Sequence, residues 1–157
     1  MATLHSTLLE QILAATPTPA RGAAAAPAPA ARTKGVVASG SLVVSRVKEG
    51  LPASAFDLLC QAFEVARERM CQIVQIPART LARRTVFKPE ESERIVRLGR
   101  LFQRATEVLG SDAEARTWFR APQSALGGVS PLDYADTEPG AREVEDLLGR
   151  LEHGVFA

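Results

Sequence analysis

The sequence predicts an all-α protein in which a helix-turn-helix region packs with a small C-terminal helical domain. Apolar residues recur at the spacing of one helix face from Pro89 to Leu109, which predicts a long central helix. Two shorter segments, Ala66 to Val74 and Ala78 to Arg84, are joined by about three residues, which is typical of a helix-turn-helix. The last forty residues carry an ordered series of caps, turns and apolar anchors, which indicates a small helical module.

The first region, residues 1–35, is predicted to be a flexible Ala/Pro-rich arm with one short helix. Thr3 is a possible N-cap for that helix, which ends near Ala14. Prolines at positions 17, 19, 27 and 29 follow, and proline removes a backbone donor and biases its neighbour away from the helix. The composition therefore indicates a mobile linker after the helix.

The second region, residues 36–104, contains the helix-turn-helix. It begins with an irregular apolar run from Val36 to Val47, which predicts either a short strand or an extended segment. Ser54 is then the expected cap of a helix over Ala55 to Val65. The Pro89-Glu90-Glu91 sequence is well placed to start the long helix, and Gly110 to end it.

The third region, residues 105–157, is expected to contain three short helical elements. Trp118 and Phe119 bring a large apolar area, and Trp118 is better explained as a core anchor than as a ligand platform. The expected elements are Ala113 to Arg120 behind Ser111 or Asp112 as N-cap, a brief turn from Leu132 to Asp136 behind Ser130-Pro131, and a last helix from Gly140 to Leu151.

Charge is distributed unevenly along the 157 residues, although the net charge is only +1. Residues 67–104 hold ten basic and four acidic side chains, whereas residues 105–157 hold four basic and ten acidic ones. One half can thus favour phosphate, and the other a basic protein surface.

Enzyme chemistry has little support in the sequence. The two histidines, His5 and His153, lie near opposite ends, so neither a histidine-assisted nucleophile nor a metal cluster is readily assembled. Gly127-Gly128 lacks the lysine and following helix of a phosphate loop. Cys60 and Cys71 have no second ligand pair and are expected to be buried free thiols. We expect no catalytic activity, no metal and no cofactor.

The compartment expected from the sequence is the cytoplasm. The N-terminus has no basic start and no apolar run of signal length, because Glu10 and Gln11 interrupt the only candidate. No stretch approaches the roughly 20 apolar residues that a membrane span requires, so no membrane association is expected.

A basic segment on the second helix of the helix-turn-helix and the loop after it predicts DNA binding. Arginine can meet guanine edges in the major groove and threonine can meet a phosphate. The alternative is that these side chains form a solvated face or pair with the acidic C-terminal half. The turn residue, often a left-handed glycine, is Gln75, and an arginine occupies an expected apolar site. The candidate DNA-binding residues are Arg79, Thr80, Arg83, Arg84 and Lys88.

Several of these motifs occur together, in one order, in a known family. The specific ones are Arg79-Thr80-Leu81-Ala82-Arg83-Arg84, Leu126-Gly127-Gly128 with Pro131-Leu132, and Gly140 followed by Val144, Leu148 and Gly154-Val155-Phe156. Over about Val47 to Phe156, the chain resembles the Xre/MbcA/ParS antitoxins.

The resemblance implies an antitoxin of a type II toxin-antitoxin pair without catalysis of its own. Its partner would be a RES-domain toxin that degrades NAD, held by the C-terminal domain so that the toxin's active site is obstructed. The helix-turn-helix part would dimerise, within a hetero-oligomeric complex, and bind operator DNA to repress its own operon. The implied toxin contacts are Arg150, Glu152, His153 and Phe156.

Two departures from the family pattern bear on the partner, because a tyrosine is more usual at His153 and an asparagine near Gln123-Ser124. His153 has a second explanation as the C-cap of the last helix, with Gly154 just beyond. Two other functions stay open at this stage. One is a stand-alone helix-turn-helix transcription regulator with a C-terminal dimerisation or effector domain. The other is an adaptor without DNA contact, which Gln75 keeps open.

Overall fold

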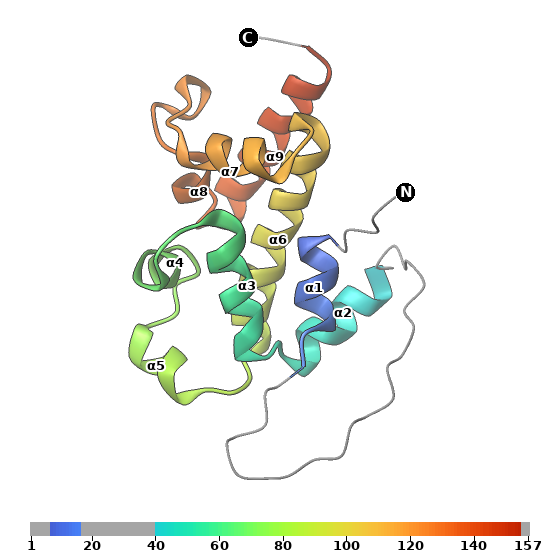
Figure 1. Ribbon diagram of the computed structural model, residues 1–157, viewed down its shortest axis with the longest axis vertical. Helices are drawn as coiled ribbons and strands as arrows, with labels where there is room; N and C mark the ends of the chain where they lie inside the picture. The colour runs from blue at the N-terminus through green and yellow to red at the C-terminus, as the bar shows by residue number, and fades with distance from the viewer. Residues whose placement is uncertain (1–6, 17–39, 155–157) are drawn as a thin grey trace.

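The computed structural model describes residues 7–16 and 40–154, and this part of the chain is helical with no strand (Figure 1). Two isolated β-bridges join loop residues: Pro52, just before α3, pairs with Val86, between α5 and α6, and Gln123 pairs with Val129, between α7 and α8. The all-α prediction is confirmed. The helices are α1 Leu8–Ala14, α2 Gly40–Glu49, α3 Ala53–Phe63, α4 Arg67–Ile73, α5 Ala78–Arg83, α6 Pro89–Leu109, α7 Asp112–Arg120, α8 Pro131–Tyr134 and α9 Glu138–Glu152, with a 3-10 turn at Ser124–Leu126.

Helix α6 is the central element, with the bounds that the sequence predicts. Proline at its first position suits the fixed φ of a first turn, and Gly110 ends it with φ +93°, a conformation that costs glycine little. Figure 1 shows α6 running along the long axis, with α1, α2 and α3 beside its first half and α7 and α9 beside its second. Every large helix of the described chain therefore packs on α6.

The core is continuous along α6. Phe63 of α3 lies edge-on to Phe102 of α6 and to Phe119 of α7, with ring centroids 5.0 Å apart in both pairs. All three rings are buried. Edge-to-face packing at this distance adds to the free energy of area burial. The aromatic cluster therefore joins the helix-turn-helix side of the molecule to its C-terminal side.

The apolar run before Gly50 is helical, so the predicted strand or extended segment is wrong where the structure describes it. Helix α2 begins at Gly40, and Val36 lies outside the described residues. Val43 is buried and Val47 packs on the core one turn later, whereas Val44 is exposed. A spacing of four between inward residues is that of a helix face.

The predicted N-terminal helix is present but begins later than expected. Thr7, not Thr3, is the N-cap of α1: its hydroxyl accepts the Glu10 N–H, and the Glu10 carboxylate accepts the Thr7 N–H at 3.0 Å. Thr3 lies outside the described residues. Ile12 and Leu13 are buried against the core, so α1 is an integral part of the fold.

Caps fix the remaining helix starts. Ser111 and Ser130 cap α7 and α8 as predicted, each accepting a backbone N–H three residues on. Ser54 does not cap α3, because the helix begins at Ala53, two residues before the predicted Ala55, and its N-cap residue is Pro52. Helix α9 begins before the predicted Gly140, behind Thr137, whose hydroxyl accepts the Gly140 N–H. Within the described residues, no helix is long and apolar enough to cross a bilayer.

Candidate functional site

The turn between α4 and α5 has the geometry of a helix C-cap closed by two backbone hydrogen bonds. The Ile76 N–H donates to the Cys71 carbonyl at 3.0 Å, and the Gln75 N–H donates to the Gln72 carbonyl at 3.2 Å. This is the Schellman arrangement, and its left-handed position is Gln75, with φ +55°. The sequence-based placement of Gln75 at the left-handed turn position is confirmed.

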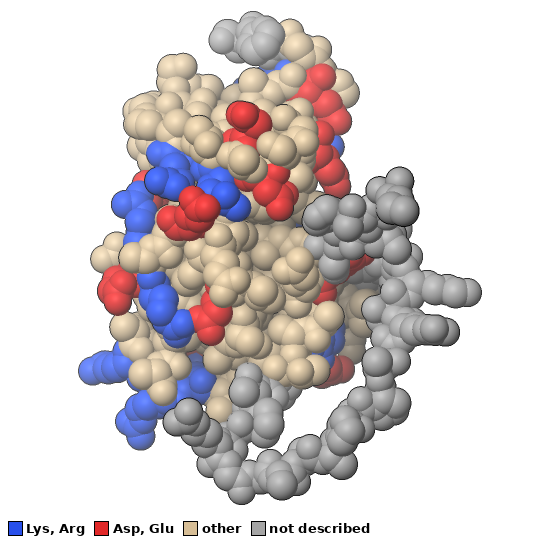
Figure 2. Space-filling view, viewed as in Figure 1, with Lys and Arg blue, Asp and Glu red and all other residues tan. Residues whose placement is uncertain are grey.

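Helix α5 presents its basic residues away from the core. Leu81 is buried, whereas Arg79 and Arg83, four residues apart on one side of the helix, are exposed. Thr80 is half-buried between them. Figure 2 shows Lys and Arg side chains gathered at the lower left of the molecule, over the position of α5 in Figure 1. Among the described residues, Arg79 and Arg83 have no carboxylate partner.

Arg84 is held differently from the other two arginines. Its guanidinium pairs with Glu91 on the first turn of α6, and the same carboxylate accepts the Lys88 N–H at 2.9 Å. Only 13% of the Glu91 side chain is exposed, whereas the Lys88 side chain lies at the surface. Glu91 thus fixes the loop between α5 and α6, and the Arg84 guanidinium is one of the two groups through which it does so. The five predicted DNA-binding residues share one end of the molecule, but not one environment.

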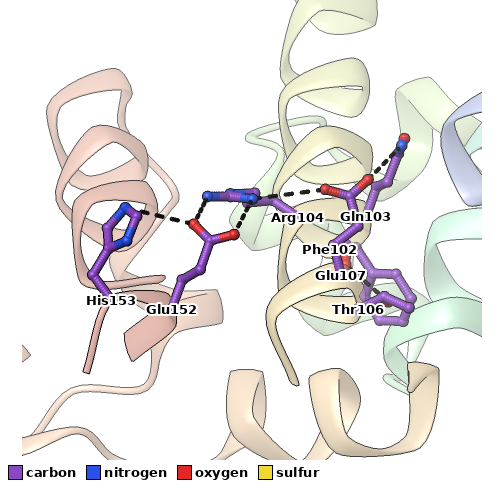
Figure 3. A network of polar contacts seen from close by, with 7 residues as sticks. All are labelled: Phe102, Gln103, Arg104, Thr106, Glu107, Glu152 and His153. Carbon is purple, nitrogen blue, oxygen red and sulfur yellow. Dashed lines mark hydrogen bonds and ion pairs between the residues drawn. The ribbon is translucent and has the colours of Figure 1, made fainter. Parts of the chain in front are cut away.

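Three of the four predicted toxin-binding residues, Arg150, Glu152 and His153, lie at the end of α9. Glu152 pairs with Arg104 of α6, and Figure 3 shows His153 on the other side of the Glu152 carboxylate, with Nε2 3.9 Å from an oxygen. The hydrogen bonds that Arg104 donates to the Glu152 carboxylate raise the pKa of Arg104 above its ordinary value. Arg150 is exposed and has no ion-pair partner among the described residues. Phe156 lies outside the described residues.

His153 is the C-cap residue of α9, as the second explanation of this histidine anticipated. Its N–H donates to the Gly149 carbonyl at 3.1 Å, and Gly154 follows with φ +66°. The imidazole itself is 74% exposed. The capping role therefore rests on the backbone and leaves the ring available at the surface.

Sequence reasoning missed the individual ion pairs between the two halves of the chain. Arg69 of α4 donates two hydrogen bonds to Asp133 of α8, at 2.9 and 2.7 Å, and Arg97 of α6 donates to Glu138 of α9 at 2.7 Å. Arg97 lowers the pKa of Glu138, with help from Arg142. The sequence signal for these pairs was the excess of basic residues over 67–104 and of acidic residues over 105–157. Both arginines of α4, and Arg97 and Arg104 of α6, pair with carboxylates, whereas the α5 arginines have no such partner in the part of the chain that the structure describes.

The two thiols are poor nucleophiles. Burial raises the pKa of Cys60 to about 11 and also raises that of Cys71, which favours the neutral thiol. Neither forms a disulfide; Cys71 is buried, as predicted, and Cys60 is half-buried. No group of three or more potential metal ligands occurs within the described residues.

Two family models match the chain, one after the other. Residues 42–100 match the antitoxin Xre-like helix-turn-helix domain, and residues 104–154 match the antitoxin Xre/MbcA/ParS C-terminal toxin-binding domain. The first match ends and the second begins within α6, between Arg100 and Arg104.

Similar proteins carry antitoxin names. An Antitoxin Xre from Yersinia enterocolitica serotype O:8 / biotype 1B (strain NCTC 13174 / 8081) is 38% identical over 143 residues, covering 83% of this chain and 97% of the relative. An Antitoxin Xre from Photorhabdus laumondii subsp. laumondii is 33% identical over 76% of this chain and 84% of the relative. A protein named Prs ADP-ribosylating antitoxin, from Sphingobium sp. (strain YBL2), is 27% identical over 71% of this chain and 78% of the relative.

The helix-turn-helix geometry, the C-terminal helical unit on α6 and the two matched models agree with these similarities. The chain therefore belongs to the Xre/MbcA/ParS family of type II antitoxins, with an Xre-like helix-turn-helix domain ahead of a toxin-binding domain.

Proposed function

We propose that this antitoxin binds a RES-type, NAD-degrading toxin through its C-terminal domain, occludes the toxin's active site and represses its own operon through the helix-turn-helix. The observation that best supports this proposal is that the exposed surface of α5 and the exposed end of α9 lie far apart. The α5 arginines lie at one end of the long axis and the end of α9 lies at the other (Figure 1). DNA and toxin can therefore be bound at the same time without competing for surface.

An NAD-using toxin is supported by the family resemblance and by the name of one relative. Xre/MbcA/ParS antitoxins, which the whole helical region resembles, are partnered with RES-domain toxins that degrade NAD. The name of the Sphingobium relative refers to ADP-ribosylation, a reaction for which NAD is the ordinary donor. A toxin with an NAD pocket is the partner class that these two similarities have in common.

The toxin surface is proposed at the end of α9. Arg150 and His153 are exposed and Glu152 is held in place by Arg104, so polar side chains lie at the surface where α9 ends. Phe156 would supply the apolar anchor of the interface, and the charges would set its orientation and association rate. Burying such a tail in the mouth of the toxin's pocket excludes substrate by steric occlusion.

The DNA surface is proposed on α5. Arg79 and Arg83 would face the major groove, where arginine meets guanine edges or phosphates, while Thr80 and Lys88 would meet the backbone. Arg84 would act beside them, with its guanidinium held by Glu91. A homodimer would place two such helices on the two halves of an operator.

The first test is co-expression of the chain with the product of the adjacent open reading frame, scoring growth and intracellular NAD. We expect the neighbour alone to arrest growth and deplete NAD, and this chain to restore both. Phe156→Ala should weaken the rescue, while Val44→Ala, an exposed apolar residue on α2 in the helix-turn-helix domain, should not. A harmless neighbour, or one that stays toxic in the presence of this chain, would instead favour a stand-alone transcription regulator.

The second test is binding to the DNA upstream of the chain's own reading frame, measured over a range of salt concentrations. Replacing Arg79 or Arg83 with methionine should weaken binding and lower the slope of log affinity against log salt by about one. Arg100→Met on α6 is the matched control, because Arg100 is exposed and lies away from α5. Unchanged affinity in both α5 variants would argue against α5 as the DNA-reading helix.

A further inference from the structure

The turn between α4 and α5 uses a costly residue at its left-handed position. Gln75 has φ +55°, where a side chain with a Cβ is disfavoured by roughly 1–2 kcal/mol relative to the right-handed region. The direction of α5 depends on this one residue, because α5 begins three residues later at Ala78 and rotates as a unit with the turn. Contacts from outside the turn can add to the two backbone hydrogen bonds that close it and help to offset this cost.

Arg94 of α6 contacts the turn directly. One guanidinium nitrogen lies 3.2 Å from the Val74 carbonyl oxygen and 3.4 Å from the Gln75 carbonyl oxygen, and it donates to both. Val74 is the C-cap residue of α4, where the helix dipole places negative partial charge and a cation is favourable, and Gln75 follows it. Arg94 is half-buried, so its guanidinium is partly shielded from water.

The toxin-binding domain contacts the same turn through the α8 segment, residues 130–136. The Gln75 side-chain amide donates to the Asp136 carbonyl at 3.4 Å. Arg69, in the first turn of α4, donates two hydrogen bonds to the Asp133 carboxylate of α8. The same carboxylate also accepts a hydrogen bond from the Ser130 hydroxyl at 2.6 Å. Both of the bonds from Arg69 come from one guanidinium nitrogen, Nη2, and hydrogen bonds between charged groups are stronger than neutral ones.

We propose that Arg94 and the α8 segment are the positioning elements of the DNA-reading helix, holding Gln75 left-handed in place of the usual glycine. This inference rests on the proposed DNA binding of α5. Arg94 and Asp133 act through the turn and touch no DNA. The toxin-binding domain thereby sets the geometry of the helix-turn-helix, so a change at α8 reaches α5 through two side chains, Arg69 and Gln75.

The test compares operator binding by Arg94→Met with that by Arg100→Met, in the full chain and on the same upstream DNA fragment. Losing a hydrogen bond from a charged group at a half-buried position should weaken binding by about tenfold. The salt slope should stay unchanged, because no phosphate contact is lost. Co-purification with the toxin should stay at the wild-type level in both variants.

Gln75→Gly supplies the readout that distinguishes positioning from general destabilisation. Glycine adopts the left-handed conformation without a steric penalty, so the turn no longer needs Arg94 to hold it. In the Gln75→Gly background, Arg94→Met should therefore cost much less than its tenfold loss in the wild-type background. An equal loss in both backgrounds would overturn the proposal.

Asp133→Asn tests the α8 segment with an opposite electrostatic expectation. Removing a carboxylate raises the net positive charge and frees Arg69, so electrostatics alone predicts tighter DNA binding. The positioning role predicts weaker binding, with the salt slope unchanged. This variant replaces a half-exposed group and so remains informative should Arg94→Met fail to fold.

The outcomes separate two failures. If the wild-type chain does not bind the upstream DNA while the toxin is still neutralised, the DNA part of the proposed function fails and the positioning role falls with it. If the wild-type chain binds and Arg79→Met weakens binding, but Arg94→Met and Asp133→Asn match the wild type, only the positioning proposal is overturned. An Arg94→Met variant with a salt slope reduced by about one would make Arg94 a DNA contact and would also overturn it.

Discussion

At the scale of single residues, Gly140 shows how closely the C-terminal elements pack. It lies in the first turn of α9 and is buried, and a Cβ built on it would collide with the backbone carbonyl oxygen of Tyr134. The Thr137 hydroxyl would be only 3.0 Å from that Cβ. Helices α8 and α9 therefore meet backbone to backbone, and the resemblance to antitoxins singled out this glycine as part of the scaffold.

Gly140→Ala should destabilise the fold by about 2–3 kcal/mol, because the backbone atom it meets cannot move aside as a side chain can. Gly149→Ala in the same helix is the control. An added Cβ there meets nothing within 4 Å, and alanine should stabilise the helix by roughly 0.5–1 kcal/mol. Urea denaturation measures both changes. Equal free energies of unfolding for the two variants would contradict the close approach of α8 to α9.

At the scale of elements, the sequence predicts well those helices that carry their own start and stop signals. Helix α6 has proline at its first position, a regular apolar face and glycine after its end, so both bounds follow from local chemistry. Ser111 and Ser130 likewise identify the starts of α7 and α8. The left-handed turn residue Gln75 is also predictable, because helix-turn-helix geometry requires one there.

Elements whose form depends on distant partners are not predictable in this way. Helix α2 carries only a short apolar run, and its inward spacing is decided by packing of Val43 and Val47 on the core beside α6. The candidate site divides similarly. The exposed arginines of α5 follow from composition, whereas the pairing of Arg84 with Glu91 and of Glu152 with Arg104 depends on how helices meet.

The junction between α5 and α6 yields a prediction about Glu91. Glu91→Ala removes the acceptor of the Lys88 N–H and leaves the Arg84 guanidinium, with 29% of its side chain exposed, without its partner. Leaving such groups unpaired should cost about 1–3 kcal/mol in the free energy of unfolding. Glu90→Ala, next to it and exposed, should cost less than about 0.5 kcal/mol. Thermal and urea unfolding would reveal the difference, and indistinguishable variants would refute the role of Glu91.

At the scale of the whole molecule, ion pairs tie the two halves together and make stability depend on pH. Arg97 and then Arg142 hold the pKa of Glu138 below its ordinary value, so the folded state favours the carboxylate. This contribution is present at neutral pH and is lost as the pH falls through the lowered pKa. Because half of the Glu138 side chain is exposed, it should be at most about 1 kcal/mol.

For Glu138, the quantity to measure is the difference in free energy of unfolding between the wild type and Glu138→Gln as a function of pH, called the stability gap below. The gap should be open at pH 7 and close in acid, once the wild-type carboxylate is protonated. Glu145→Gln, an exposed position on the same helix, is the control for loss of a carboxylate from α9 that leaves the ion pair between Arg97 and Glu138 intact. A gap for Glu138→Gln that persists in strong acid would mean that the ion pair with Arg97 is not its source.

The two matched domains share one helix, so we expect them to unfold as a single unit. The boundary between them falls inside α6, and the rings of Phe63, Phe102 and Phe119 cross it, so neither half can keep its core after the other is lost.

Phe56→Leu in α3 should destabilise the fold by about 1–2 kcal/mol. The decisive quantity is the midpoint seen by Trp118, the single tryptophan, which lies on α7 at the far side of the boundary. It should shift as much as the midpoint of helix content seen by circular dichroism, because coincident transitions are the signature of two-state unfolding. A Trp118 midpoint that stays at the wild-type value would instead mean that the toxin-binding domain folds on its own, and that α6 is cut in two when the helix-turn-helix melts.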